Sequence, residues 1–505
     1  MNRCVDGCVD AHVNGDENDA TKTRSNSGVC IMPTIVTIDP VTRLEGHLRV
    51  DVTIEPVDGK QQVVDAHISG TSFRGFETML MDREPSETPH LTQRICGVCS
   101  VPHGVAAAIT LEKAGHCTIP ENACLLRNLV MGANFIQSHI LHFYHLSLLD
   151  YVDGLGMPPW EQKWNVDCRI SPDDSARLMD HYKAALIAVR QTNEMAAVFA
   201  GRQPHSPALV PGGFTNVPTV TQITEFRKYC GLIADFIRNV YMPDVDFIAS
   251  QYIDYSRLGR GYGNLLAFGG FALDVAGEKK FFAAGRVTNG GKEIELVNPE
   301  VVTEQVTYSW YDNGSTNRHP SNGVIQAVYP KNRAYSWIKA PRYEGEPYET
   351  GPLARMMIGG FYRKGISVND RHKARAIEAL TIVEAIPDWL DAIKLGEPVY
   401  SNCATPAEAD AVGLSEAPRG ALGHWLKIRN SKIAHYQVVT PTCWNASPRD
   451  DRQKQGPIEK ALVGTPVKDP KQPIEVLRII HSFDPCLACA VHVCRPSNPA
   501  RIVKF

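Results

Sequence analysis

Two Cys-x-x-Cys pairs stand near opposite ends of this 505-residue chain and constrain its fold more than any other feature. The first pair is Cys96 and Cys99, and the second is Cys486 and Cys489. The short loop of such a pair turns both sulfur atoms toward one metal ion, so two pairs supply four soft thiolate ligands. A site that joins both pairs can form only after the intervening chain has folded. The spacing therefore predicts a metal centre inside one large, continuous fold.

A structural zinc site is the alternative that the cysteines alone leave open. In small zinc modules the second pair follows the first within roughly twenty residues. Here the two pairs bracket most of the protein. A buried structural zinc would account for the four cysteines, but it would not account for the other motifs described below.

Composition excludes several classes of function. Hydrophobic residues make up 43% and charged residues 21% of the chain, as in ordinary globular proteins. The net charge of -3 gives no electrostatic basis for binding nucleic acid. No uncharged apolar run approaches the roughly 20 residues of a membrane-spanning helix. Residues 1–30 are polar and lack the apolar core of a signal peptide, so we expect a disordered leader there.

Hydrophobic periodicity predicts a mainly α fold. Helices are expected over 102–114, 121–151, 172–200, 220–250, 371–394 and 473–482. Alternating residues predict a small sheet over 35–68 and a hairpin over 425–439 with its turn at Asn430-Ser431. Residues 258–347, rich in Gly, Tyr and Asn, predict an α+β insertion. We therefore expect a long-helix bundle with small peripheral sheets, built as a single unit over 31–492.

Several further residues are candidates for the site or for the core. Glu45 and Glu77 precede the first cysteine pair, in segments dense with Gly and Arg. A carboxylate beside a thiolate-ligated metal can accept a proton, and one farther away can hold a hard cation. Arg94 and Arg419 could compensate the charge of four thiolates, although each taken alone is more often a surface or ion-pair residue. Cysteines that stand singly are expected to be small buried hydrophobes, and they include Cys117 and Cys403.

Five motifs in order give the chain a specific resemblance over about 35–492. They are Asp39-Pro40-Val41-Thr42-Arg43-Leu44-Glu45-Gly46-His47; Phe73-Arg74-Gly75-Phe76-Glu77; Arg94-Ile95-Cys96-Gly97-Val98-Cys99 with His103; Glu416-Ala417-Pro418-Arg419-Gly420; and Asp484-Pro485-Cys486-Leu487-Ala488-Cys489 with His492. In these motifs the chain resembles the large, catalytic subunit of a nickel-iron hydrogenase, most closely the respiratory membrane-bound or periplasmic uptake group. The resemblance implies reversible heterolytic cleavage of dihydrogen into protons and electrons.

The resemblance also implies the ligands of the metal centre. All four cysteines would hold nickel, and Cys99 and Cys489 would bridge to an iron that carries carbon monoxide and two cyanides. In the family's pattern, Pro418, Arg419 and Thr442 match residues that lie beside the cyanides. His103 and Asp484 match groups that orient the thiolates and the arginine. At the position of Ser138 many respiratory members carry an aspartate, so the resemblance implies no carboxylate there in this chain.

The same resemblance implies a proton acceptor, a cation site and a C-terminal segment that is removed. Glu45 matches the proton acceptor beside the terminal thiolate of Cys486. Glu77, the backbone carbonyl of Val438 and the imidazole of His492 match a site for magnesium or another hard cation. The residues after the histidine, 493–505, resemble a C-terminal peptide that a maturation endopeptidase removes.

Electrons must leave through a partner, because the chain has no further Cys-x-x-Cys pair and no flavin or nicotinamide motif. The resemblance implies an obligate small subunit that carries iron-sulfur clusters, with the long helices here forming much of the interface. It places the two subunits at the periplasmic side of the membrane, exported together, and it allows a cytochrome or membrane anchor and higher oligomers of the heterodimer.

The alternative within the same fold is a subunit of a quinone-reducing respiratory complex that binds no nickel. The four cysteines and the cleavable tail speak against it.

Overall fold

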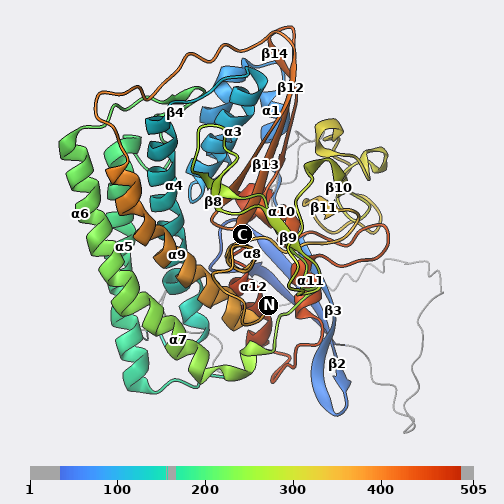
Figure 1. Ribbon diagram of the computed structural model, residues 1–505. Coiled ribbons are helices and arrows are strands. Elements are labelled where there is room, and N and C mark those ends of the chain that lie inside the picture. Colours follow the sequence, from blue (N-terminus) through green and yellow to red (C-terminus); the bar gives the residue numbers. More distant parts are fainter. Residues whose placement is uncertain (1–33, 155, 157–166, 491–505) are drawn as a thin grey trace, which may run out of the picture. The chain divides into compact units, whose positions relative to one another are not determined.

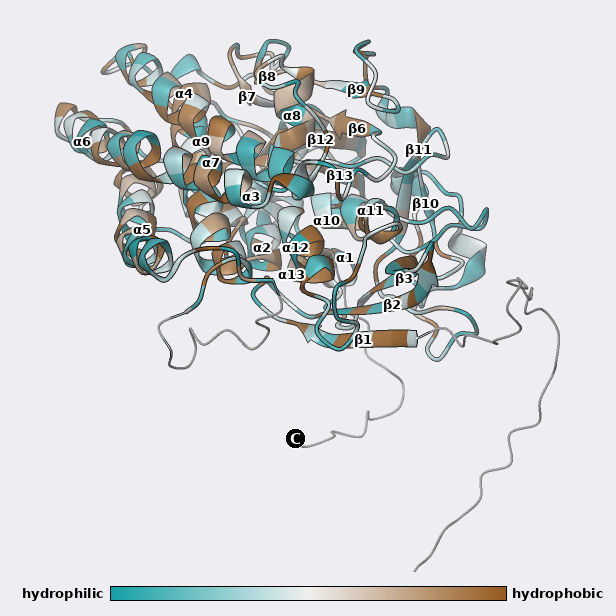
Figure 2. Ribbon diagram, turned by 90° about the horizontal axis from the view of Figure 1, so that it is seen from below, coloured by the Kyte–Doolittle hydropathy of each residue, from teal (hydrophilic) through white to brown (hydrophobic). Residues whose placement is uncertain are grey.

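The computed structural model describes residues 34–154, 156 and 167–490 (Figure 1). His492, the predicted leader and the predicted C-terminal peptide lie outside these residues. Long helices form a bundle in which α4 (Glu121–Leu141) packs against α5 (Pro172–Ala200) and α9 (Val368–Asp391). Helix α6 (Val220–Phe236) packs on α5 and α9, and α7 (Met242–Gln251) packs on α9. The bundle arises because each helix has an apolar stripe to bury, and Figure 2 shows hydrophobic and hydrophilic residues alternating around α5, α6 and α7.

The predicted helices are present, with two departures in their interiors. Helix α5 has the predicted bounds. The predicted helix over 121–151 passes through a π-helical turn, His142–Ser147, and ends in a 3-10 turn, Leu148–Asp150. The one over 220–250 contains another π turn at Ile237–Tyr241. A π turn accommodates one extra residue without ending the helix, so the apolar periodicity continues through it.

A three-stranded antiparallel sheet forms the N-terminal part of the described chain. It consists of β1 (Thr34–Val41), β2 (Leu48–Val57) and β3 (Lys60–Gly70), in that order. Side chains of β2 alternate between buried and half-buried from Leu48 to Glu55, which produces the alternation seen in the sequence. The β2–β3 turn is Asp58-Gly59, both with positive φ, as a two-residue hairpin with right-handed twist requires.

A second antiparallel sheet is formed by β12 (Ala409–Ala417), β13 (Gly420–Arg429) and β14 (Lys432–Val439). The predicted hairpin is β13–β14, and its turn is Asn430-Ser431, both with positive φ. Strand β12 was not among the predicted elements. Helix α3 (Ser100–Ala114) packs on β12 and β13, which brings the first cysteine pair to this sheet.

Short elements complete the described chain. The predicted α+β insertion contains pairs of short strands: β6 (Leu265–Ala267), β7 (Gly270–Ala272), β8 (Lys280–Phe282), β9 (Gly285–Val287), β10 (Val302–Gln305) and β11 (Ala340–Tyr343). The remaining short elements are α1 (Phe76–Leu80), α2 (Thr88–Thr92), β4 (Leu209–Val210), β5 (Gly213–Phe214), α8 (Pro352–Ile358), α10 (Pro441–Asn445), α11 (Pro457–Leu462), α12 (Ile474–Ser482) and α13 (Leu487–Ala490). The predicted fold class, a helical bundle with small sheets, is confirmed.

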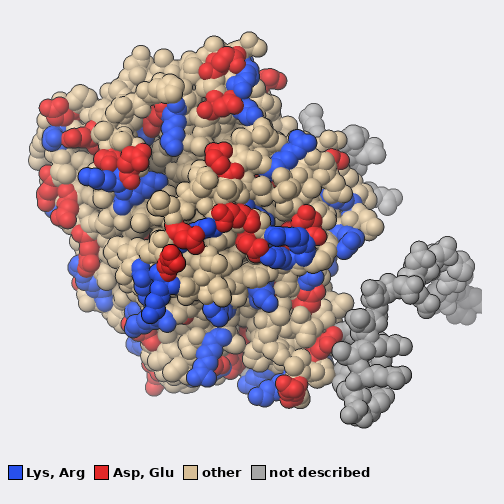
Figure 3. Space-filling model, turned by 45° about the vertical axis from the view of Figure 1, so that its right-hand side comes forward, with Lys and Arg blue, Asp and Glu red and all other residues tan. Residues whose placement is uncertain are grey.

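The surface carries mixed charge. Figure 3 shows basic and acidic side chains interspersed over one face of the molecule. Among the described residues, no helix is both long enough and apolar enough to cross a bilayer.

Candidate metal centre

The four cysteine sulfur atoms meet in the interior of the protein. Their Sγ atoms all lie within 4.8 Å of one another, and each residue is at most 2% exposed. The closest contacts between the two pairs are Cys99–Cys489 at 3.1 Å and Cys96–Cys486 at 3.4 Å. Metal–sulfur bonds of about 2.3 Å place adjacent sulfurs of one ligand shell roughly 3 to 4 Å apart. The four residues therefore fit a soft metal centre.

Both cysteine pairs stand at the ends of helices. Cys99 is the N-cap residue of α3, whose unpaired N-terminal amides favour a nearby thiolate. The second pair follows α12, after a backbone reversal at Asp484 with φ +54. Hydrogen bonding from Cys486, above all, holds the pKa of the Cys96 thiol well below its usual range. Burial raises the pKa of the Cys489 thiol.

Glu45 lies beside this cluster, joined to the second pair by side chain and backbone. Its Oε2 is 3.4 Å from Cys486 Sγ and accepts a hydrogen bond from the Ala488 amide at 3.2 Å. The Glu45 carbonyl accepts another from the Leu487 amide at 2.7 Å. Gly46 permits this close approach, because a Cβ there would lie 2.7 Å from the Ala488 nitrogen. Burial raises the pKa of the Glu45 carboxyl, with a further contribution from Cys96, and this favours proton uptake.

Arg419 provides a buried cation at the cluster. Its Nη2 donates to Asp484 Oδ1 and its Nε to the Asp484 carbonyl, both at 3.0 Å. Its Nη1 approaches Ser138 Oγ at 3.4 Å, so a serine hydroxyl lies beside this arginine where an aspartate is expected in many respiratory members. Thr442 Oγ1 accepts a hydrogen bond from the Cys486 amide at 2.9 Å.

The other predicted site residues lie farther out. Glu77 on α1 and Val438 on β14 are both 1% exposed, and these two elements pack together. His103 Nδ1 lies 3.2 Å from His424 Nε2. Arg94 is exposed, so its side chain does not compensate charge from within the core.

Arg74 joins the two cysteine loops, although sequence analysis gave it no role. Its guanidinium donates to the carbonyls of Ile95 at 2.5 Å, Arg94 at 3.0 Å and Ala488 at 3.4 Å. Arg74 stands in the motif Phe73-Arg74-Gly75-Phe76-Glu77, and this position was the sequence signal that could have indicated its role. A cavity of about 450 Å³ reaches the cluster at this point, and it is lined by residues that include Glu45, Arg74, Arg94, Cys96 and His205.

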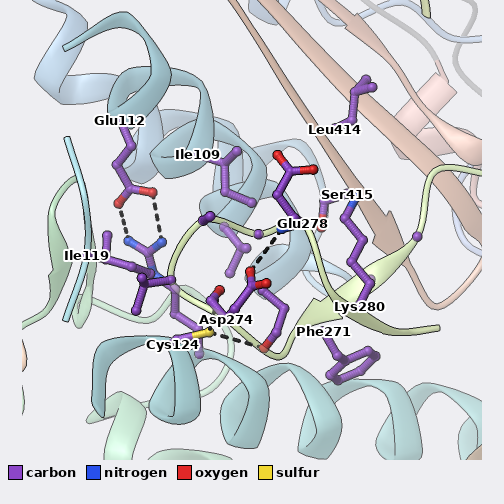
Figure 4. Close-up of a pocket in the computed structure, with 18 of the residues that line it drawn as sticks. Ile109, Glu112, Ile119, Cys124, Phe271, Asp274, Glu278, Lys280, Leu414 and Ser415 are labelled. Atoms are coloured by element: carbon purple, nitrogen blue, oxygen red, sulfur yellow. Dashed lines mark hydrogen bonds and ion pairs between the residues drawn. The ribbon is translucent and has the colours of Figure 1, made fainter. Parts of the chain in front are cut away.

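A larger cavity of about 790 Å³ lies elsewhere, between α3, α4 and the β7–β8 segment (Figure 4). None of the four cluster cysteines lines it. Figure 4 shows Cys124 and Glu112 on the wall of this cavity. Cys124 Sγ lies 3.1 Å from the Ala272 carbonyl and Glu112 accepts from the Arg127 guanidinium, so both side chains are engaged within the protein.

Cys117, on the wall of that cavity, forms a disulfide with Cys403. The prediction that both are small buried hydrophobes was wrong. The sequence separates them by 286 positions, and only the packing of the loop before β12 against the end of α3 brings them together.

Comparisons with known proteins agree with this geometry. The family model for nickel-dependent hydrogenase matches residues 74–158, 156–365 and 361–492, and a HoxL-like model matches residues 35–73. The periplasmic NiFeSe hydrogenase large subunit of Desulfomicrobium baculatum is 39% identical, with 91% of this chain and 95% of that protein covered. The uptake hydrogenase large subunit of Bradyrhizobium diazoefficiens is 32% identical, with 92% and 96% covered.

Solved structures give the same result. The reduced Ni-Fe-Se hydrogenase of Desulfovibrio vulgaris Hildenborough aligns with a TM-score of 0.87 and 40% identity, covering 91% of this chain and 100% of that chain. A chain with these motifs, this fold and a buried four-cysteine cluster is a hydrogenase subunit that works with a small subunit. It belongs to the nickel-dependent hydrogenase large-subunit family.

Proposed function

We propose that this chain cleaves dihydrogen heterolytically at a nickel-iron centre held by Cys96, Cys99, Cys486 and Cys489. One observation carries the proposal: four buried sulfur atoms lie within 4.8 Å of one another, and a carboxylate oxygen of Glu45 lies 3.4 Å from one of them. A nickel-iron centre bound by these residues would supply the Lewis acidity and the electron acceptor that such a cleavage requires. Thiolate ligands suit both metals because both accept soft donors.

Glu45 is the proton acceptor in this proposal. Its carboxylate is within reach of the Cys486 sulfur and faces the cavity that leads away from the cluster. A carboxyl group with a raised pKa takes up a proton readily and releases it again, as a relay requires. Glu45 therefore carries the proton from Cys486 toward the cavity.

Arg419, Pro418 and Thr442 would lie beside an iron that carries one carbon monoxide and two cyanide ligands. Arg419 retains donor capacity on a guanidinium that Asp484 holds in place. The Thr442 hydroxyl accepts from the Cys486 amide and can still donate its own proton. Such donors favour the partial negative charge on cyanide nitrogen.

We place magnesium or another hard cation at Glu77 and the Val438 carbonyl, with His492 as the further ligand from outside the described residues. The packing of α1 on β14 supports this arrangement. Residues 493–505 are then the segment that an endopeptidase removes, and residues 31–492 act as one catalytic unit.

Electrons pass to a small subunit that carries iron-sulfur clusters. The first cysteine loop reaches the surface at Arg94, two residues before Cys96, which supports an electron exit to the partner at this loop. The named relative from Desulfomicrobium baculatum is periplasmic. The Cys117–Cys403 disulfide is of a kind that persists in oxidising compartments, which supports a periplasmic location here too.

Hydrogen-dependent reduction of an artificial electron acceptor tests the function. The purified heterodimer should reduce the acceptor under dihydrogen but not under argon, and the Cys486→Ser variant should be inactive. The Cys168→Ser variant is the control, because Cys168 is a half-buried cysteine outside the cluster. An inactive wild-type heterodimer that contains zinc and no nickel would contradict the proposal.

A further inference from the structure

The hairpin that presents Arg419 has only two residues at its tip. Ala417 pairs with Gly420 across β12 and β13, so Pro418 and Arg419 form the whole connection. Asp484 holds the Arg419 side chain of this turn. The backbone of the turn is held by its two strands and by a further arginine that contacts its carbonyls.

Arg355 on α8 lies behind this hairpin and is 0% exposed. Its Nη1 donates to the Ala417 carbonyl at 3.0 Å, and its Nη2 donates to the Pro418 carbonyl at 2.8 Å. The remaining donors bind two carboxylates. Nε and Nη2 form a bidentate pair with Glu378 at 2.5 and 2.7 Å, and Nη1 donates to Glu416 at 2.6 Å. These five bonds use all five N–H donors of a guanidinium.

The carboxylates that hold Arg355 are themselves fixed by other elements. Glu378 on α9 lies 2.7 Å from His139 Nε2 on α4. Burial lowers the pKa of His139 to about 4, so the imidazole is neutral and donates this hydrogen bond. Glu416 accepts a second hydrogen bond from the Phe268 amide at 2.6 Å. Arg355 is thus held directly by α9 and by the end of β12, and His139 and Phe268 fix the two carboxylates that bind it.

We propose that Arg355 is a positioning residue for the metal centre: it holds the carbonyls of Ala417 and Pro418 and thereby sets the direction of Arg419. This inference rests on the proposed contact between Arg419 and the cyanide ligands. A lysine cannot replace Arg355, because one ammonium has three donors and lacks the planar fork that binds two carbonyls and two carboxylates together.

Infrared spectroscopy of the intact, nickel-loaded heterodimer is the test, because cyanide stretching bands respond to hydrogen-bond donors. In the Arg355→Lys variant we expect the cyanide bands to shift or broaden beyond the variation among wild-type preparations, with nickel and iron contents unchanged. The turnover rate should fall in parallel. These bands report the position of donors at the iron, which a purely structural role would leave unchanged.

Arg342→Lys is the matched control. Arg342 on β11 is also fully buried and makes five hydrogen bonds, to Asp450, Ser447 and the carbonyls of Pro341, Pro448 and Lys454. None of these partners belongs to the metal centre. This variant should lower the melting temperature and leave the cyanide bands at their wild-type positions.

Glu378→Gln provides a second variant, because it weakens the support of Arg355 without removing the guanidinium. A smaller shift of the same bands is expected. Wild-type bands in both Arg355→Lys and Glu378→Gln, or bands that move equally in Arg342→Lys, would overturn the inference. Failure of both variants to yield a nickel-loaded heterodimer would assign Arg355 to folding and would also overturn it. A wild-type spectrum without carbon monoxide or cyanide bands would instead contradict the proposed function.

Discussion

Glu45 Oε2 lies 3.4 Å from Cys486 Sγ, across a backbone bridge that joins the two residues. These residues come from the first fifty and the last twenty residues of the chain, so the contact exists only in the completed fold. A proton released at the sulfur has an acceptor within one step. Several expectations depend on this relationship and on the residues around it.

Replacing Glu45 with glutamine should remove the proton acceptor and preserve the shape of the site. Loss of a general acid–base group costs about 10²- to 10⁴-fold in rate, so hydrogen-dependent turnover should fall by that amount while metal content is retained. Isotope exchange between dihydrogen and heavy water should slow in parallel. Glu55→Gln, on the neighbouring strand β2, is the control and should keep full activity. Unchanged turnover in Glu45→Gln would rule out this proton route.

Asp484 should matter more to activity than Ser138, although both contact Arg419. The Asp484 carboxylate accepts a charged hydrogen bond from the guanidinium at 3.0 Å, whereas the Ser138 hydroxyl lies at 3.4 Å. The second bond, to the Asp484 backbone carbonyl, is not altered by a side-chain substitution. Hydrogen bonds to charged groups are the stronger kind, about 1.5–3 kcal/mol each. We expect Asp484→Asn to lower turnover by roughly ten- to a hundredfold and Ser138→Ala to lower it by less. Steady-state turnover rates of the two variants, compared at equal nickel content, measure this difference. A larger loss in Ser138→Ala than in Asp484→Asn would show that Ser138 contributes more to holding Arg419.

The Cys117–Cys403 disulfide should stabilise the chain. Removing a native disulfide typically costs about 2–5 kcal/mol, and this one closes a long stretch of sequence. The double variant Cys117→Ser/Cys403→Ser should therefore unfold at a lower temperature, with hydrogenase activity at low temperature unchanged. Cys168→Ser should melt like the wild type. Alkylation of both cysteines without prior reduction would show that the bond is absent from the purified protein.

Glu459 on α11 should make stability depend on pH near neutrality. Burial raises the pKa of its carboxyl to about 7, from an ordinary value of 4.5. A raised pKa means that the folded protein binds this proton more tightly than the unfolded chain, so the stabilisation is present below about pH 4.5 and is lost as pH rises through 7. The loss is on the order of 3 kcal/mol.

Calorimetry between pH 5 and 8.5 measures this dependence. The melting temperature of Glu459→Gln should change less over the range than that of the wild type, because glutamine does not titrate. Glu55→Gln should follow the wild-type profile. If the melting temperatures of Glu459→Gln and the wild type changed equally with pH, a residue other than Glu459 would be responsible for the pH dependence.

Much of this fold could be predicted because its signals are local. The apolar spacing of residues 172–200 predicted α5, and the Asn430-Ser431 turn predicted the β13–β14 hairpin. Strand β12 escaped prediction because its sequence, Ala-Asp-Ala-Val-Gly-Leu-Ser-Glu-Ala, has little β-branched content and gains its conformation from pairing with β13. Its partner β13 follows after only two residues, but the Pro418-Arg419 connection lacks the usual Asn-Gly or Asp-Gly signal of a hairpin turn.

The residues of the site also divide into those with a local sequence signal and those without one. The cysteine pairs and Glu45 stand in motifs whose chemistry is visible in the residue types. Arg355 could not be found in this way, because a single arginine in a short helix has the same sequence signal whether it is exposed or makes five buried hydrogen bonds. Cys117 and Cys403 have no spacing relationship that would have indicated their bond.

Metal analysis of the purified heterodimer tests the central claim most directly. We predict one nickel bound to this chain, with sulfur as its ligand by X-ray absorption, and an iron beside it; Cys96→Ser and Cys489→Ser should each lose the nickel. Zinc in four-sulfur coordination, with nickel absent from fully folded protein, would contradict the account.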